Sequence, residues 1–149
     1  MASNFGQDCQ HVFVYGSLMY LPVWSQVVQG LYACENAVAT GFQRHAVPNE
    51  TYPGMVRNPA AQVQGIVWLD VSPQDLQRLD AFEGVEYQRE TIEVKLNKNG
   101  SSIQAGTYLW RDPATLSETL WSVASFESDG LQAFLNKHVG AWTNSGQRK

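Results

Sequence analysis

Residues 12–20 read Val-Phe-Val-Tyr-Gly-Ser-Leu-Met-Tyr, a strand-forming run that passes directly into glycine and serine. β-branched and aromatic residues favour a buried strand, and Gly16 allows the backbone to turn sharply where that strand ends. A turn with bare N–H groups and few side chains in the way can hold an anion or a developing oxyanion. The stretch therefore predicts a buried strand that leads to an anion-binding turn, although an ordinary strand and turn would give the same pattern.

The composition predicts a single domain with a substantial core. The chain has 149 residues, of which 44% are hydrophobic and 11% aromatic. Its net charge of −4 gives no broad basic field, so we expect neither nucleic acid nor a membrane surface as a partner. Residues 1–10 lack the apolar core of a signal peptide, and no run approaches the ~20 apolar residues of a membrane span. We expect a soluble, cytoplasmic protein.

Cysteine and histidine give no sign of a metal site or a disulfide framework. Cys9 and Cys34 are the two cysteines, and the three histidines are scattered without the spacing of metal ligands. Neither a Gly-x-Ser-x-Gly elbow nor a phosphate-binding loop occurs. Ser17 as a nucleophile, and Cys34 paired with His45, are weaker hypotheses because nothing local in the sequence supports either.

Helices are predicted from their end signals. Pro22 favours a helix start within 21–28. Ser72 can cap a helix over 72–83, which Gly84 ends, so Glu83 lies at or near its last position. A short helix is expected over 116–124. Leu131, Phe134, Leu135 and His138 form one stripe of a terminal helix.

Strands are predicted from alternation and turn residues. Ile92, Val94 and Leu96 alternate with polar residues over 87–96, and Asn99-Gly100 predicts a hairpin to a partner strand over 103–110. Further strands are expected over 31–47, with a bulge at Gly41, and over 63–71, with a loop over 48–59 between them. About six strands and three helices, joined mostly by hairpins and loops, favour an α+β fold with a curved or closed sheet. We expect tails over 1–10 and 144–149 around one domain, 11–143.

Glu83 is the candidate acid and base. Ala81, Phe82 and Val85 suggest an apolar setting in which burial would raise the pKa of the carboxyl toward neutrality. A solvated glutamate at a helix end would give the same local sequence, and Glu86 is the rival carboxylate.

Three motifs together resemble one family. They are Val14-Tyr15-Gly16-Ser17-Leu18, then Tyr52-Pro53-Gly54, then Leu79-Asp80-x-Phe82-Glu83-Gly84-x-x-Tyr87-x-Arg89. In this order they resemble the γ-glutamylcyclotransferase-like superfamily over residues 11–136. The short segment Gly84-Val85-Glu86 favours its AIG2-like and γ-glutamylamine cyclotransferase-like branch.

The resemblance implies a small mixed β-barrel with flanking helices and an enzyme without metal or cofactor. In the reaction that it implies, the α-amine of a γ-glutamyl group attacks its own γ-carbonyl, and an amine and 5-oxoproline are released. Glu83 would be the catalytic residue that takes and returns the proton. The expected substrate-binding residues are Tyr15, Gly16, Ser17, Leu18, Met19, Tyr20, Tyr52, Pro53 and Tyr87. The alternative is a non-catalytic small-molecule binding or interaction protein that keeps the fold and the pocket.

Overall fold

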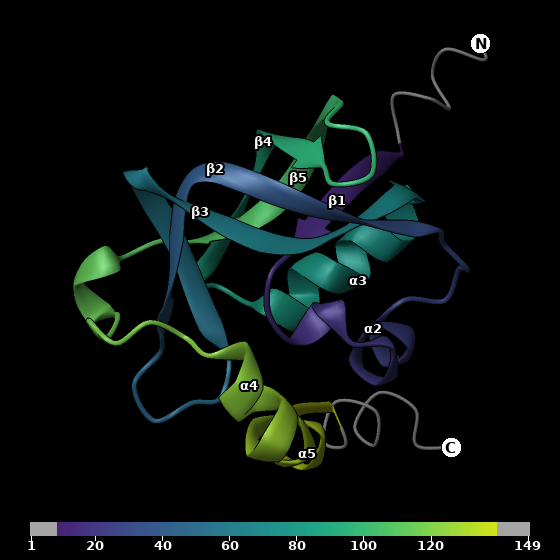
Figure 1. Ribbon diagram of the computed structural model, residues 1–149. Helices are drawn as coiled ribbons and strands as arrows, with labels where there is room; N and C mark the ends of the chain where they lie inside the picture. Colours follow the sequence, from purple (N-terminus) through teal and green to yellow (C-terminus); the bar gives the residue numbers. More distant parts are fainter. Residues whose placement is uncertain (1–8, 140–149) are drawn as a thin grey trace, which may run out of the picture.

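The computed structural model describes residues 9–139, and the strands within them close into a barrel (Figure 1). Around the barrel the order is β1 (Gln10–Val14), β3 (Pro53–Val71), β2 (Cys34–Ala46), β4 (Tyr87–Leu96) and β5 (Ser102–Trp110). Neighbouring strands are antiparallel except β1 and β5, whose parallel pairing closes the barrel. The predicted α+β fold with a small mixed barrel is confirmed. The predicted tails fall outside the described residues except for positions 9 and 10, and Gln10 already belongs to β1.

β1 is buried on both faces. Val12 and Val14 belong to a hydrophobic cluster that also contains the buried residues of the helices. Phe13 and Tyr15 belong to a second cluster, which is built from alternate residues of the other strands. Burial on both faces explains why the run from Val12 to Tyr15 contains no charged residue.

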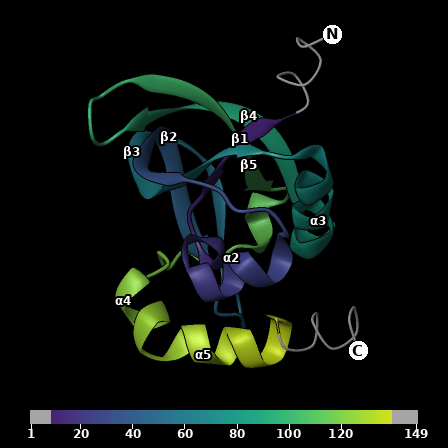
Figure 2. The same ribbon diagram turned by 90° about the vertical axis from the view of Figure 1, so that its right-hand side faces the viewer.

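The helices gather at one end and one side of the barrel. Figure 2 shows α2 (Leu21–Val27) beside α4 (Val123–Ser125) and α5 (Leu131–Phe134), and α3 (Pro73–Glu83) along the barrel wall. Short 3-10 helices cover Ser17–Met19 and Pro113–Thr115, and π-helical turns cover Phe126–Gly130 and Leu135–Val139. Trp24 of α2 stacks on Trp68 of β3 with ring centroids 4.3 Å apart, which fixes α2 against the barrel.

α3 has the end signals that its sequence predicted. The Ser72 hydroxyl accepts a hydrogen bond from the N–H of Asp75 at 3.1 Å, and Pro73 occupies the first turn. Gly84 follows with φ of 85°, a conformation that favours glycine. The helix therefore stops at Glu83 and leaves that carboxyl at its end.

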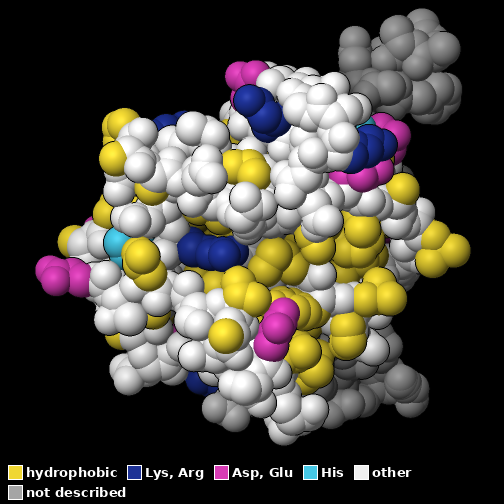
Figure 3. Space-filling model, in the orientation of Figure 1, with side chains coloured by type: hydrophobic (Ala, Val, Ile, Leu, Met, Phe, Trp, Pro, Cys, Tyr) yellow, Lys and Arg dark blue, Asp and Glu magenta, His cyan; other side chains and the backbone are white. Residues whose placement is uncertain are grey.

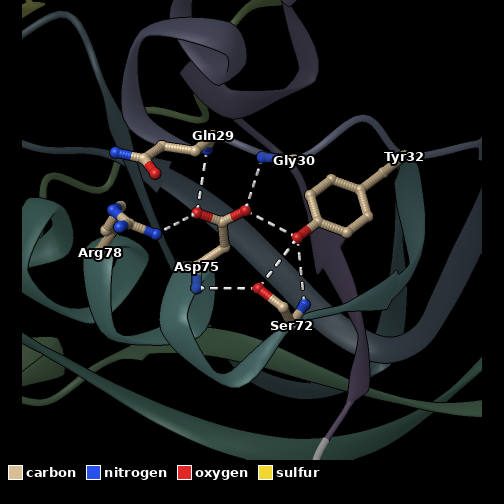
Figure 4. A network of polar contacts seen from close by, with 6 residues as sticks. All are labelled: Gln29, Gly30, Tyr32, Ser72, Asp75 and Arg78. Carbon is tan, nitrogen blue, oxygen red and sulfur yellow. Dashed lines mark hydrogen bonds and ion pairs between the residues drawn. The ribbon is translucent and has the colours of Figure 1, made fainter.

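Asp75 ties the end of α2 to the start of α3 (Figure 4). Its carboxylate, 2% exposed, accepts hydrogen bonds from the N–H groups of Gln29 and Gly30, each at 2.9 Å. The Tyr32 hydroxyl at 2.7 Å and the Arg78 guanidinium at 2.7 Å complete the set. Burial alone would raise the pKa of Asp75, but these donors outweigh it and the pKa lies below its ordinary value.

The prediction of a loop over 48–59 is wrong from Pro53 onward. β3 begins at Pro53, and residues 53–57 pair with residues 42–46 of β2. Proline is tolerated at the first residue of a strand, and Pro59 lies where the register shifts between Thr40 and Phe42, so neither ring removes a needed hydrogen bond. The bulge predicted at Gly41 is confirmed there, and its φ is 91°.

The prediction of a helix over 116–124 is also wrong. Residues 117–120 run along the end of β2 instead: the Ser117 N–H donates to the Ala46 carbonyl, and the Ala46 N–H donates to the Thr119 carbonyl, both at 2.9 Å. Helix begins only at Val123 and continues through π-helical turns to Val139. In the predicted terminal stripe Phe134 is buried, whereas the side chain of His138 lies outside what the structure describes.

Candidate active site

A cavity of about 120 Å³ lies where the turn after β1, the start of β3, the end of α3 and α5 meet. Residues from six separate segments of the chain contribute to it. They are Phe13, Val14, Tyr15, Gly16, Ser17, Leu18, Tyr52, Pro53, Phe82, Glu83, Tyr87, Tyr108 and Phe134.

The cavity brings together most of the residues predicted for substrate binding and catalysis. Met19 and Tyr20 are the two that do not line it. They border a separate hollow instead, where the Tyr20 hydroxyl donates to the Glu127 carboxylate at 3.0 Å.

The turn after β1 offers backbone donors. Met19 donates its N–H to the Gly16 carbonyl at 3.0 Å, but the N–H groups of Gly16, Ser17 and Leu18 have no acceptor among the described residues. A side chain is excluded at Gly16, because a Cβ there would lie 2.7 Å from Cδ of Pro53. Close packing against Pro53 and the start of a helical turn together leave three donors unused at the cavity wall.

Arg44 holds this turn from behind. Its guanidinium Nη1 donates to the Tyr15 carbonyl at 2.6 Å and to the Gln64 carbonyl at 3.1 Å. The same guanidinium lies 5.1 Å from the ring centroid of Trp121, a cation–π contact. The first residue of the turn is thus fixed to β2 and β3.

Glu83 has the electrostatic properties of a base that works near neutral pH. Burial, together with the nearby charge of Asp80, raises the pKa of its carboxyl from 4.5 to about 8. No lysine, arginine or histidine lines the cavity in the described part of the chain, so no cation counteracts this shift. A carboxyl of this kind can both accept and return a proton.

Most of the residues that bury Glu83 are not the apolar neighbours from which its burial was predicted. Val85 is 87% exposed and Ala81 is also exposed, so of the three apolar neighbours only Phe82 lines the cavity. The remaining cover comes from aromatic residues that are distant in sequence.

Two buried tyrosines stiffen the cavity wall. The Tyr15 hydroxyl donates to the Tyr108 carbonyl, and the Tyr87 hydroxyl donates to the Pro53 carbonyl at 2.7 Å. Burial raises the pKa of Tyr15 and of Tyr87 well above the ordinary value of tyrosine. Both hydroxyls therefore stay neutral and serve as fixed hydrogen-bond donors.

Five lining residues were not predicted as site residues from the sequence: Phe13, Val14, Phe82, Tyr108 and Phe134. Each of the five belongs to a predicted strand or helix. The sequence pattern indicates that such an element is there, but it does not show which distant residues lie beside it in the fold.

The two weaker catalytic hypotheses find no support in the geometry. No histidine lines the cavity beside Ser17 within the described residues. Cys34 and His45 lie at opposite ends of β2, and His45 Nδ1 is 3.1 Å from the Ser117 carbonyl oxygen. No group of three or more histidine, cysteine or acidic residues able to hold a metal occurs in the described range.

Charged side chains are sparse on the face of the molecule that Figure 3 shows. Figure 3 shows hydrophobic side chains gathered over the centre of one face, with acidic and basic side chains scattered singly or in small groups among and around them. None of the helices described is both long enough and apolar enough to cross a bilayer.

Residues 12–126 match the family described as gamma-glutamyl cyclotransferase, AIG2-like. The chain belongs to this family. It is 33% identical over 107 residues to AIG2-like protein C of Arabidopsis thaliana, and the match covers 72% of this chain but only 62% of that protein. AIG2-like protein D of the same organism is 31% identical over 127 residues, with 83% of each chain covered.

Solved structures agree with this AIG2-like assignment. The solution structure of an Arabidopsis thaliana protein is 29% identical, with a TM-score of 0.67 and 87% of each chain covered. The crystal structure of an AIG2-like protein from Mus musculus is 26% identical with a TM-score of 0.60, covering 72% of this chain and 82% of that one. A structure described as gamma-glutamyl cyclotransferase, 18% identical with a TM-score of 0.61, shares the fold. The family resemblance predicted from the motifs is confirmed.

Proposed function

We propose that this chain is a γ-glutamyl cyclotransferase that converts a γ-glutamyl amine into 5-oxoproline and the free amine. The observation that carries the proposal is the position of Glu83. A carboxyl with a pKa of about 8 lies in the same small cavity as a turn with three unused backbone N–H groups.

Glu83 would act twice. In the first step its carboxylate removes a proton from the substrate α-ammonium, and the neutral nitrogen then attacks the γ-carbonyl carbon of the same glutamyl group. In the second step the Glu83 carboxyl returns that proton to the leaving nitrogen as the original C–N bond breaks, and the ring nitrogen gives its extra proton to the released amine, which departs as an ammonium ion. The five-membered ring and the amine are the only products, so neither water nor a cofactor is consumed.

The turn at Gly16, Ser17 and Leu18 would hold negative charge. Its unused N–H groups can bind either the substrate carboxylate or the oxyanion that forms on the attacked carbonyl. The glutamyl chain must fold back on itself for its amine to reach its γ-carbonyl, and a small cavity favours that folded shape.

The rest of the lining favours an uncharged or cationic leaving amine. Tyr52, Phe82 and Phe134 offer aromatic rings, and no basic side chain of the described residues lines the cavity. Aromatic faces attract apolar and cationic groups, whereas a second carboxylate on the leaving group would be buried without a counter-charge. We therefore propose γ-glutamyl derivatives of simple amines and diamines as better substrates than those of α-amino acids.

An assay with matched compounds tests this function. The protein is incubated with γ-glutamyl butylamine, a γ-glutamyl diamine and a γ-glutamyl α-amino acid, and 5-oxoproline is measured by mass spectrometry. We expect release from the first two to exceed release from the third, and Glu83→Gln to slow it by on the order of 10²- to 10⁴-fold.

Binding without turnover would favour the alternative. If one of these compounds binds, as seen by calorimetry, but no compound gives 5-oxoproline, the chain is a binding protein that keeps the pocket of the family.

A further inference from the structure

Asp80 and Arg89 form a hydrogen-bonded network beside the cavity. Asp80 lies one turn before Glu83 on α3, and its two carboxylate oxygens accept from Nε and Nη2 of Arg89 at 2.9 and 3.1 Å. The third hydrogen bond to Asp80 comes from the Tyr108 hydroxyl at 2.6 Å. Nη1 of Arg89 donates to the Gln10 side chain at 2.6 Å. The network thus joins β1, α3, β4 and β5.

Tyr108 connects this network to the site. Tyr108 lines the cavity together with Glu83, whereas Asp80 and Arg89 do not. Tyr108 is 4% exposed, and its hydroxyl donates to Asp80. This hydrogen bond fixes the position of the Tyr108 ring. The ion pair itself is partly exposed, with side-chain exposures of 32% for Arg89 and 44% for Asp80. Most ion pairs as exposed as this one contribute little to stability, and the bidentate geometry makes this pair stronger than a single contact and fixes the orientation of both side chains.

We propose that Asp80, held by Arg89, is a positioning residue for Glu83: it fixes the Tyr108 ring beside the carboxyl and places a partly neutralised negative charge one helical turn away. Arg89 sets how much of that charge Glu83 experiences. The proposal rests on the proposed role of Glu83 as acid and base.

Few other charges act on Glu83. On its own helix, Asp80 is the carboxylate that raises its pKa after burial. From the other elements the titratable groups that face it are tyrosines, namely Tyr15, Tyr52, Tyr87 and Tyr108, each with its pKa raised. Arg89 is the cation bound to Asp80. Its charge also lowers the pKa of Tyr108, against the larger effects that raise it. The charge of Asp80 therefore adds to the effect of burial on the pKa of Glu83, and Arg89 is the cation that lies against that charge.

Two substitutions should shift the pKa of Glu83 in opposite directions. Asp80→Asn keeps one oxygen that can accept from Tyr108 and from Nε of Arg89, loses the acceptor of Nη2 and removes the negative charge, so the pKa of Glu83 should fall. Arg89→Met keeps much of the side-chain length but leaves Asp80 unbalanced, so the pKa of Glu83 should rise. Arg89→Lys keeps the charge without the two-pronged geometry, and it should restore most of the wild-type pKa.

The test follows the Glu83 carboxyl directly. The full chain is labelled with ¹³C at glutamate side chains, the Glu83 resonance is assigned by its loss in Glu83→Gln, and each variant is titrated by NMR. Glu90→Gln is the matched control, because it breaks another partly exposed ion pair of the barrel, to Arg57, and does not line the cavity. We expect opposite shifts for Asp80→Asn and Arg89→Met and none for the control.

Activity adds a second readout. The pH at which kcat/KM reaches half its maximum should shift with the Glu83 pKa in each variant, by the same sign. Equal shifts in both variants, or no shift in either while the proteins remain folded by NMR, would overturn the proposal. Because the NMR titration needs no substrate, it decides the role of Asp80 even if no γ-glutamyl compound is turned over.

Discussion

At the scale of single residues, the proposed chemistry depends on one half-buried carboxyl, that of Glu83, beside neutral tyrosines and the charge of Asp80. Glu83 combines a helix-end position with aromatic cover, and the tyrosines around it donate their hydroxyls elsewhere. Because these three tyrosine hydroxyls donate to other acceptors and not to Glu83, we propose that the carboxyl can exchange its proton with a substrate.

The first expectation concerns Glu83→Gln. Glutamine keeps the size and much of the polarity but cannot accept a proton at neutral pH, so the rate should fall on the order of 10²- to 10⁴-fold. Glu86→Gln is the control, since Glu86 is exposed and lies beyond the turn at Gly84. The measurement is 5-oxoproline release on the best substrate found. Near-full activity of Glu83→Gln, or loss in Glu86→Gln instead, would show that the base is misassigned.

The second expectation concerns stability and pH. The folded protein keeps the Glu83 proton between pH 4.5 and about 8, where the unfolded chain has lost it. The contribution of Glu83 to the free energy of unfolding is therefore fully present below pH 4.5 and is lost as the pH rises through about 8. Urea unfolding of wild type and Glu83→Gln should show the variant gaining relative stability across this window, with a slope of up to about 1.4 kcal/mol per pH unit. A difference that stays constant from pH 5 to 9 would mean that the carboxyl titrates normally.

At the scale of elements, the site depends on a turn whose backbone is exposed to the cavity. Gly16 packs against Pro53, and Arg44 fixes the carbonyl of Tyr15 behind it. The start of the turn is thus held by β2 and β3, whose residues lie far from it in the sequence.

The third expectation concerns Gly16→Ala. A Cβ here would collide with the Pro53 ring at 2.7 Å, so the turn must shift, and KM for the substrate should rise about tenfold or more while the fold persists. Gly41→Ala is a matched control: its φ of 91° makes alanine costly by about 1 kcal/mol, but the glycine lies in the bulge and does not line the cavity. Steady-state kinetics and melting temperatures separate the two effects. The expectation fails if Gly16→Ala lowers the melting temperature and leaves KM unchanged.

The fourth expectation concerns the junction of α2 and α3. Asp75→Ala leaves the N–H groups of Gln29 and Gly30 without their acceptor, and it should cost about 2–4 kcal/mol of unfolding free energy. Because the folded pKa of Asp75 is lowered, the stability that it contributes is present above its unfolded pKa and is lost as pH falls through the folded one. The cost should accordingly shrink at acid pH. Glu90→Ala, in an exposed pair, should cost less than about 1 kcal/mol in the same denaturation assay.

Elements with local signals could be predicted, and those made by distant pairing could not. α3 was predicted at both ends because Ser72 and Gly84 act within one turn of the chain. The first residues of β3 were missed because they are strand only through pairing with β2, which no local pattern reports. For the same reason the hairpin signal placed Tyr108 in a strand over 103–110 but did not indicate that it borders the cavity with Glu83.

At the scale of the whole molecule, the barrel and the C-terminal helical segment differ in how firmly they are held. β1 is paired on both sides and buried on both faces. Residues 123–139 are attached to the rest mainly through side chains, of which Phe126 and Phe134 are the most buried, at 2% and 3% exposure. Phe134 also forms part of the cavity wall. We therefore expect occupancy of the cavity to be coupled to how tightly this segment docks.

The fifth expectation follows from that coupling. In hydrogen exchange, amides of β1 should exchange only by global unfolding, whereas those of residues 131–139 should exchange by local opening at lower free energy. Saturating 5-oxoproline, the proposed product, should slow exchange in 131–139, because a ligand that contacts Phe134 binds only the docked segment. Amides of the hairpin at residues 97–101, on the barrel rim and away from the cavity lining, serve as the internal control and should not change. If the ligand binds but leaves 131–139 as fast as before, the C-terminal segment is a passive cover and the cavity wall is complete without it.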